Sequence, residues 1–420
     1  MEKITVIKGF KDILPDDSPL WCEVESVARN VFSSYGFREI RVPIIEKTEL
    51  FKRSIGETTD IVEKEMYTFR DRDDDLLTLR PEATASVIRS YIEHNMLAYE
   101  PVTRLFTIGP MFRRERPQKG RFRQFHQIDV ELFGEDNPQA DAEVILMLVH
   151  FLESTGLQDL SLEINSLGCK ACRPGFSQAV IDYLKGFEKE LCPDCQRRMN
   201  TNPLRVFDCK VESCGIIIKK APRILDYLCP GCTGHFAQVK SCLSDLQVKY
   251  EINPAMVRGL DYYVKTAFEV KSGALGAQNS LAGGGRYDGL VSDLGGPEVA
   301  GIGFGIGIER LLACLPDREK TKYKTDLFIA ALGDRAQRIG FMLSYELRRA
   351  GITAAMDYSD KSLKSQMKRA DKLNSSYTLI FGDKEIDEKS LELRNMNTKK
   401  QQVLPLDNLL ESIISVIKER

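Results

Sequence analysis

The stretch from Gly109 to Gly134 carries cations toward one end and carboxylates toward the other. Two predicted strands, 104–115 and 121–133, flank a turn that contains Pro117 and Gly120. Because side chains alternate between the two faces of a strand, one face of this hairpin should be charged and the other largely apolar. A polyphosphate at the cationic end and a cationic substrate at the acidic end would suit this layout.

Six lysine or arginine residues lie between residues 113 and 123, against one glutamate. Phe125 is the one aromatic residue on the charged face, where it could stack on a base. A solvated sheet face would also be polar, but it would not separate the two signs of charge, so we interpret the hairpin as part of an active site. The charged face comprises Arg113, Glu115, Arg121, Arg123, Phe125, Gln127, Asp129 and Glu131.

The segment FRRERPQKGRFRQFHQ, residues 112–127, resembles motif 2 of the class II aminoacyl-tRNA synthetases, specifically of the histidyl-tRNA synthetase family. LRPEATA at 79–85 and RGLDYY at 258–263 resemble two further segments of that family, and GIGFGIGIERLL at 301–312 resembles motif 3. The helix expected at 16–36 and the proline-containing strand after it resemble motif 1, which implies a homodimer. The resemblance covers nearly all of the chain.

The resemblance implies that the protein ligates histidine to its tRNA in two steps, through a histidyl-adenylate made from ATP. Arg113 and Arg258 would then be the catalytic residues, since they would stabilise charge at the α-phosphate. The implied ATP-binding residues are Arg113, Glu115, Arg121, Phe125 and Arg310. The implied histidine-binding residues are Glu82, Ala83, Thr84, Arg113, Gln127, Glu131, Arg258, Tyr262 and Tyr263. The expected contacts to the acceptor end of the tRNA are Arg116, Gln118 and Arg123.

The resemblance implies two further details of this site. Glu131, with Tyr263, would accept the imidazole N–H of histidine, and magnesium should accompany ATP. Neither step demands a covalent nucleophile from the protein, because alignment and charge stabilisation around the α-phosphorus would be sufficient.

Eight of the eleven cysteines form four pairs within residues 169–240, which the resemblance identifies as the insertion specific to this family. In a reducing compartment they should be thiols or metal ligands rather than disulfides. Pairs at this spacing suit tetrahedral zinc, and eight ligands could form two structural sites, with His235 as a substitute ligand. A helical insertion with reduced thiols and no metal is the open alternative. The pairs are Cys169 and Cys172, Cys192 and Cys195, Cys209 and Cys214, and Cys229 and Cys232.

The predicted fold class is α+β. A class II synthetase catalytic domain with an antiparallel sheet is expected at residues 1–320, interrupted by the mainly helical insertion at 169–240. A polar linker, LPDREKTKYKTD, comes next, and from residue 326 predicted strands alternate with helices. This alternation predicts a small α/β domain with a partly parallel sheet at 326–420, which resembles the anticodon-binding domain of several class II synthetases.

The 420-residue chain has a net charge of −2 and a hydrophobic content of 43%, both ordinary for a globular protein. An RNA partner is compatible with this charge, because local basic patches carry such binding. We find no signal-peptide pattern and no apolar stretch of about 20 residues, so we expect a cytoplasmic protein outside the membrane. The alternative functions are that of a regulatory paralogue that supports ATP phosphoribosyltransferase and that of a zinc-dependent RNA-binding module without catalysis.

Overall fold

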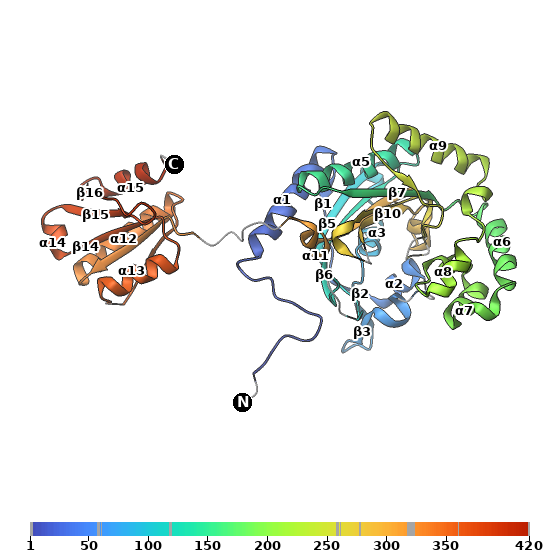
Figure 1. Cartoon of the computed structure of the whole chain (residues 1–420), viewed down its shortest axis with the longest axis horizontal. Helices are drawn as coiled ribbons and strands as arrows, with labels where there is room; N and C mark the ends of the chain where they lie inside the picture. The colour runs from blue at the N-terminus through green and yellow to red at the C-terminus, as the bar shows by residue number, and fades with distance from the viewer. Residues whose placement is uncertain are drawn as a thin grey trace. The chain divides into compact units, whose positions relative to one another are not determined.

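The chain divides into two compact units, Met1–Arg318 and Glu319–Arg420, and each has its own sheet and hydrophobic core (Figure 1). The computed structural model describes residues 3–56, 59, 61–116, 120–257, 260, 262–276, 279–316, 324–359 and 361–418.

An eight-stranded sheet with the order β1-β5-β6-β11-β10-β9-β7-β8 forms the centre of the first unit. The inner pairings are antiparallel, and the outermost pairing at each edge is parallel. The predicted α+β class with an antiparallel core sheet is confirmed. The strands are β1 (Arg38–Glu39), β5 (Thr103–Phe112), β6 (Gln124–Phe133), β7 (Leu160–Ser166), β8 (Glu251–Ile252), β9 (Val264–Ser272), β10 (Ser280–Arg286) and β11 (Gly301–Gly307).

The predicted hairpin is strands β5 and β6, whose pairing runs from Thr103 opposite Phe133 to Phe112 opposite Gln124. Both strands end earlier near the turn than the sequence predicted. The cause is competition for backbone hydrogen bonds, because the Arg114 N–H donates to the Glu65 carbonyl and the Arg123 N–H donates to Gly9. The predicted turn residue Pro117 lies outside the described residues.

The two faces of β6 differ as predicted. Ile128, Val130 and Leu132 are fully buried in the main hydrophobic core of the unit. Helices α1 (Ser18–Ser34) and α5 (Pro138–Ser154) contribute to the same core. The opposite face of β6 is therefore the one that remains for polar side chains.

Helix α1 buries Val24, Ala28, Val31 and Phe32, whose spacing places them on one side of a helix. Beyond it, the predicted proline-containing strand is present as two short strands on either side of Pro43, β1 and β2 (Ile45–Lys47).

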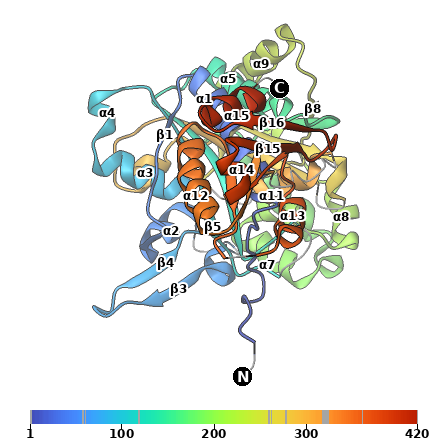
Figure 2. The same ribbon diagram turned by 90° about the vertical axis from the view of Figure 1, so that its left-hand side faces the viewer.

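A small antiparallel sheet, β2-β4-β3, consists of β2, β3 (Tyr67–Arg70) and β4 (Leu76–Leu79), and the β3–β4 hairpin projects from the body of the unit (Figure 2). Strand β4 leads through Arg80 toward helix α3 (Thr84–Glu93). Helices α2 (Thr48–Ile55) and α4 (Met96–Tyr99) flank this region. The buried Arg80 guanidinium donates to the carbonyls of Val42 at 3.0 Å and Pro110 at 2.9 Å, which ties the β4–α3 connection to β5.

The insertion is mainly helical and has its own small core. It comprises α6 (Arg173–Lys185), α7 (Pro193–Thr201) and α8 (Glu212–Ile218), and the chain returns to the main core through α9 (Pro230–Asp245), as the green ribbon in Figure 1 shows. Two short helices, α10 (Leu290–Asp293) and α11 (Ile308–Cys314), complete the unit.

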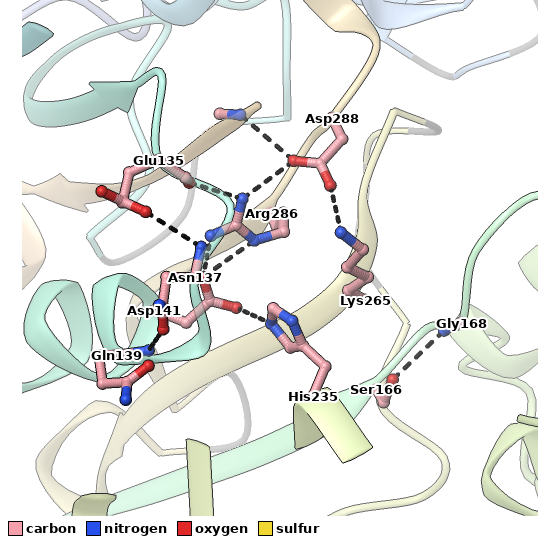
Figure 3. Close-up of polar contacts among 11 residues, drawn as sticks. Glu135, Asn137, Gln139, Asp141, Ser166, Gly168, His235, Lys265, Arg286 and Asp288 are labelled. Atoms are coloured by element: carbon pink, nitrogen blue, oxygen red, sulfur yellow. Dashed lines mark hydrogen bonds and ion pairs between the residues drawn. The ribbon is translucent and has the colours of Figure 1, made fainter. Parts of the chain in front are cut away.

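A buried ion network joins α9 to the central sheet (Figure 3). The Arg286 guanidinium, fully buried at the end of β10, bonds to the Asp141 carboxylate of α5, and His235 of α9 lies 2.7 Å from the other Asp141 oxygen. Asp288 accepts from Arg286 at 3.0 Å and from Lys265 at 2.8 Å. The opposite charges of Arg286 and Asp141 neutralise each other, which is what allows this pair to be fully buried.

The second unit contains a five-stranded sheet with the order β13-β12-β14-β15-β16, parallel between the first three strands and antiparallel between the last three. Strand residues Leu327 and Ile329 face one core and Phe328 faces another, so both faces of the sheet are covered. The partly parallel sheet is confirmed. The strands are β12 (Leu327–Leu332), β13 (Ala354–Met356), β14 (Tyr377–Gly382), β15 (Ser390–Asn395) and β16 (Gln401–Pro405); the helices are α12 (Asp334–Arg349), α13 (Leu363–Lys372), α14 (Asp383–Asp387) and α15 (Leu409–Lys418). Within the described part of the chain, no helix combines the length and apolar character that a membrane crossing requires.

We expect Arg286→Met to destabilise the first unit by roughly 3–5 kcal/mol, because it leaves Asp141 as a buried charge without its arginine partner. Denaturant unfolding followed by a probe in this unit measures the change. Arg70→Met removes an exposed ion pair with Asp74 and should change stability by less than about 1 kcal/mol. Equal effects of the two substitutions would contradict the role assigned to the buried network.

Candidate active site

Three carboxyl groups are buried together on the polar face of the central sheet. Asp129 and Glu131 come from β6 and are 4% and 2% exposed, and Glu82, just before α3, is 4% exposed. Glu82 Oε1 accepts the Ala85 N–H at 3.0 Å, so it also caps the start of α3.

Glu131 is held by two hydroxyl groups. Thr84 Oγ1 donates to Glu131 Oε1 at 2.6 Å, and the Tyr287 hydroxyl donates to Glu131 Oε2. Tyr263 was the predicted partner of Glu131, and Tyr287 was not predicted, although it directly follows the GGGR stretch at residues 283–286. Thr84 and Glu131, both among the predicted histidine-binding residues, are in direct contact.

Burial raises the pKa of all three carboxyl groups. The pKa of Asp129 rises to about 8, because burial and the negative charge of Glu82 outweigh the nearby Arg80 and Arg113. Burial also raises the pKa of Glu131 well above its usual value, despite the two hydroxyl donors. A cationic ligand would stabilise the ionised forms, so this group of carboxyls favours a positively charged substrate.

Two buried acceptor atoms beside these groups have no hydrogen-bond partner among the described residues: Gln127 Oε1 and Asp129 Oδ2. Buried polar atoms are normally hydrogen-bonded, and an unmatched pair on one strand face indicates a place for a ligand donor. Gln127 also lines the large cleft described below, so it connects that cleft to the acidic pocket.

Glycines of β11 make room for the acidic side chains. Gly303, Gly305 and Gly307 pair with Glu131, Asp129 and Gln127, respectively. A Cβ atom on Gly305 would lie 2.8 Å from Asp129 Oδ1, and one on Gly303 would collide with the Glu131 carboxylate. The glycines of the motif 3 segment therefore permit the carboxyl groups to be buried between the strands.

Tyr262 and Tyr263 lie beside Tyr287, in the segment that leads into β9. The ring of Tyr262 is 5.8 Å from that of Tyr287, edge to face, and 4.6 Å from that of Tyr263. Burial, followed by nearby negative charge, raises the pKa of both Tyr262 and Tyr287 well above the usual range, so both phenols stay protonated. The predicted residue Arg258 lies outside the described residues.

A cleft of about 740 Å³ extends from Gln127 toward the turn end of the hairpin. Arg113 donates from Nε to the Pro81 carbonyl at 2.8 Å, and its guanidinium lies 5.3 Å from the centre of the Phe125 ring. Arg121 forms a 2.9 Å ion pair with Glu115. The predicted ATP-binding residues all line this cleft: Arg113, Glu115, Arg121, Phe125 and Arg310.

One anchoring pair was missed by the sequence analysis. Both carboxylate oxygens of Glu309 lie 3.0 Å from the His126 backbone N–H, and Oε1 is also 3.0 Å from His126 Nδ1. This contact fixes the start of β6 to α11. Arg310, the next residue, donates from Nε to the Ser280 carbonyl at 2.7 Å, so its guanidinium is oriented along the cleft wall.

Two of the predicted tRNA contacts, Arg116 and Arg123, lie toward the turn end of the hairpin. Arg116 is exposed, and Arg123 contacts the N-terminal segment through the Lys8 carbonyl at 3.4 Å. Neither lines the cleft. Gln118 lies outside the described residues.

The insertion supplies part of the cleft wall, which the sequence analysis did not anticipate. No local motif marks these residues, because their placement depends on how the insertion packs. The cations concerned are Arg197, Arg198, Arg205 and Lys210.

The eight paired cysteines form two separate groups of four, and within each group the sulfur atoms lie within 4.8 Å of one another. His235 is not in either group, since its ring contacts Asp141; its suggested role as a substitute ligand is wrong. The first group is Cys169, Cys172, Cys229 and Cys232, and the second is Cys192, Cys195, Cys209 and Cys214.

Comparisons with known proteins agree with this architecture. The sequence model of the histidyl-tRNA synthetase family matches residues 9–170 and 228–311, and that of an anticodon-binding domain matches 326–415. The chain is 53% identical over 419 residues to the histidine–tRNA ligase of Desulfosudis oleivorans, covering 99% of each protein. It is 54% identical over 403 residues to that of Geobacter sulfurreducens, covering 96% of this chain and 97% of the relative.

Among solved structures, apo histidyl-tRNA synthetase from S. aureus superimposes with a TM-score of 0.83 at 40% sequence identity, covering 98% of this chain and 100% of that one. Together with the family match and the near full-length relatives, this shows that the chain belongs to the histidyl-tRNA synthetase family.

Proposed function

We propose that this protein ligates histidine to its cognate tRNA. In the first step the histidine carboxylate attacks the α-phosphorus of ATP, which forms histidyl-adenylate and releases pyrophosphate. In the second step the 3′-hydroxyl of the terminal tRNA adenosine takes the histidyl group and AMP leaves. The observation that carries the proposal is the acidic pocket with two unmatched buried acceptors, joined through Gln127 to a cation-lined cleft.

The acidic pocket suits the amino acid. The α-ammonium group of histidine would be received by Glu82, Thr84 and Gln127, beside the backbone of Ala83. Its imidazole N–H would be accepted by Glu131, which Thr84 and Tyr287 already orient. Tyr262 and Tyr263 would complete the pocket. Because this site hydrogen-bonds a polar substrate, it would strongly reject analogues that lack those groups.

The cation-lined cleft suits ATP. Arg113 and Arg258 would stabilise charge around the α-phosphorus, and Arg121 and Arg310 would hold the outer phosphates. Phe125 would stack on the adenine, with Glu115 accepting from its amino group. Arg113 is already oriented by the Pro81 carbonyl, so little reorganisation is needed when the phosphate binds.

Magnesium accompanies ATP in this proposal. The cleft is also lined by the carboxylate of Glu269, and carboxylate oxygen is a donor that Mg²⁺ prefers. When bound, the ion would neutralise phosphate charge. The insertion would carry structural zinc at its eight paired cysteines, which are donors of the kind found in closed zinc sites.

The remaining parts of the proposal concern organisation and partners. Residues 1–320 form the catalytic domain, interrupted by the insertion at 169–240, and 326–420 form the anticodon-binding domain. Arg116, Gln118 and Arg123 contact the acceptor end of the tRNA. The protein works in the cytoplasm as a homodimer.

Histidine-dependent exchange of labelled pyrophosphate into ATP tests the activity. We expect exchange without tRNA, and transfer of labelled histidine to tRNA when that is added. A regulatory paralogue or a simple RNA-binding module would show neither reaction, so absence of exchange in the purified full-length chain would overturn the proposal.

We expect Glu131→Gln to raise the KM for histidine roughly 10- to 100-fold while changing the KM for ATP much less, because the substitution removes the charged protein group that accepts the imidazole N–H. Steady-state pyrophosphate exchange measures both constants. Glu115→Gln should give the reverse pattern, with the larger change for ATP. An equal rise in both constants for Glu131→Gln would contradict its assignment to the imidazole.

Asp129→Asn should alter the pH dependence of stability in the ligand-free protein. In the folded wild type the pKa of Asp129 is about 8, whereas an unfolded aspartate ionises near pH 4. As the pH rises, the unfolded chain therefore releases this proton at a lower pH than the folded chain does. The stability of the wild type relative to the variant then falls as the pH rises from about 4 to about 8. We expect a relative loss of roughly 2–4 kcal/mol between pH 5 and pH 8.

Thermal unfolding at a series of pH values measures the Asp129 effect, with Asp293→Asn on the surface as the control. Parallel pH profiles for the wild type and Asp129→Asn would show that this carboxyl does not titrate as assigned.

A further inference from the structure

The two groups of four cysteines have the spacing of metal ligands. In the first group Cys169 Sγ is 3.6 Å from Cys172 Sγ and 3.9 Å from Cys229 Sγ. In the second group Cys192 Sγ is 3.8 Å from Cys209 Sγ. Four sulfurs placed about 2.3 Å from one zinc ion in a tetrahedron are about 3.8 Å apart. The observed separations therefore match a zinc tetrathiolate, and they are far longer than the roughly 2.0 Å of a disulfide.

A backbone amide contacts one ligand sulfur in each group. The Cys229 N–H donates to Cys172 Sγ at 3.1 Å, and the Cys192 N–H donates to Cys214 Sγ at 3.2 Å. Hydrogen bonds to a charged ligand atom fix its position around a metal. In both groups, the N–H of the first cysteine of one pair donates to the sulfur of the second cysteine of the other pair. This repeated hydrogen bond indicates two organised metal sites rather than chance proximity of thiols.

We propose that the insertion binds two zinc ions with different roles. One ion joins the two chain segments that connect the insertion to the catalytic core. The other fixes the position of residues 196–213, which carry the cations that line the substrate cleft. The family model stops at residue 170 and resumes at 228, so five of the eight ligands lie in the unmatched stretch between: Cys172, Cys192, Cys195, Cys209 and Cys214.

The first site joins the two chain segments that connect the insertion to the catalytic core. Cys169 and Cys172 follow β7, and Cys229 and Cys232 begin α9. Immediately beyond this site, His235 of α9 contacts Asp141 in the buried network of Figure 3. The zinc therefore closes a loop of about 60 residues at its base, beside a rigid part of the core.

The second site encloses the cleft-lining cations. Cys192 and Cys195 lie at the start of α7, Cys209 precedes α8, and Cys214 lies within it. Every insertion cation that lines the cleft lies in sequence between Cys195 and Cys214: Arg197, Arg198, Arg205 and Lys210.

A closed tetrathiolate contributes folding energy where a small segment has little core of its own. Arg197 and Arg198 lie in α7, whereas Arg205 and Lys210 lie between α7 and α8, so a zinc ion that joins the cysteines on both sides would tie all four cations to one fixed point. The second zinc therefore positions a cationic wall toward phosphate groups in the cleft, whether those belong to ATP or to tRNA. This consequence for substrate binding rests on the proposed function, whereas the zinc content does not.

Zinc analysis of the full-length protein, purified without chelator, tests the sites directly. We expect about two zinc ions per chain. Replacement by Co²⁺ should give the visible absorption of a tetrathiolate complex, and titration with an organomercurial should release both ions. Fewer than about two zinc ions, or a cobalt spectrum without thiolate character, would overturn the two-site assignment.

Single serine substitutions separate the sites. Cys229→Ser and Cys209→Ser should each lower the content to about one zinc per chain, whereas Cys22→Ser, outside both groups, should leave two. Full zinc content in either ligand variant would contradict the assignment. Should a variant not fold, the cobalt and mercurial measurements on the wild type still decide the metal content.

Kinetics test the role of the second site. Cys209→Ser should raise the KM for ATP in pyrophosphate exchange, the KM for tRNA in aminoacylation, or both, by roughly fivefold, because several cations leave the cleft wall. The two assays show which phosphates the wall contacts. Lys210→Ala, which leaves the thiols intact, should shift the same constant while retaining two zinc ions. Loss of one zinc without a change in either constant would overturn the link to the cleft, and absence of all exchange in the wild type would instead overturn the proposed function.

Discussion

The burial of Glu82, Asp129 and Glu131 beside one another is the constraint on which the site depends. Each carboxyl carries a raised pKa because it has lost contact with water, and the neighbouring charges make simultaneous ionisation unfavourable. A substrate that brings its own positive charge removes that penalty. The empty acceptors of Gln127 and Asp129 make the same pocket a poor host for an apolar ligand.

The rest of the catalytic unit keeps this unfavourable arrangement in place. Glycines on β11 leave space for the carboxyl groups, while Thr84 and Tyr287 fix the Glu131 side chain from two directions. The His126–Glu309 contact joins β6 to α11. Apolar residues on the other face of β6 pack into the main core, and this packing fixes the position of the strand that carries Asp129 and Glu131. Arg113, Arg121 and Arg310 line the adjoining cleft, where the phosphates are proposed to bind.

Much of this could be predicted from local sequence patterns. The alternation along residues 124–133 correctly separated a polar face from an apolar one, because the period of a strand is two whatever its surroundings. The alternating elements after residue 326 correctly indicated a partly parallel sheet. The strand ends near the hairpin turn were placed too far out, since the backbone of Arg114 bonds to Glu65 and that of Arg123 to Gly9. Such competing partners are distant in sequence, so no local pattern reveals them.

The sequence by itself determined which residue types could perform the chemistry: guanidinium groups, buried acids, tyrosines and paired thiols. Only the tertiary structure decided which of them meet. It gave Glu131 the hydroxyl of Tyr287, placed insertion cations in the cleft wall, and grouped Cys169 and Cys172 with Cys229 and Cys232. The physical reason is that a hydrogen bond or metal site requires atoms within a few ångströms, and sequence spacing sets that distance only within a single helix, strand or turn.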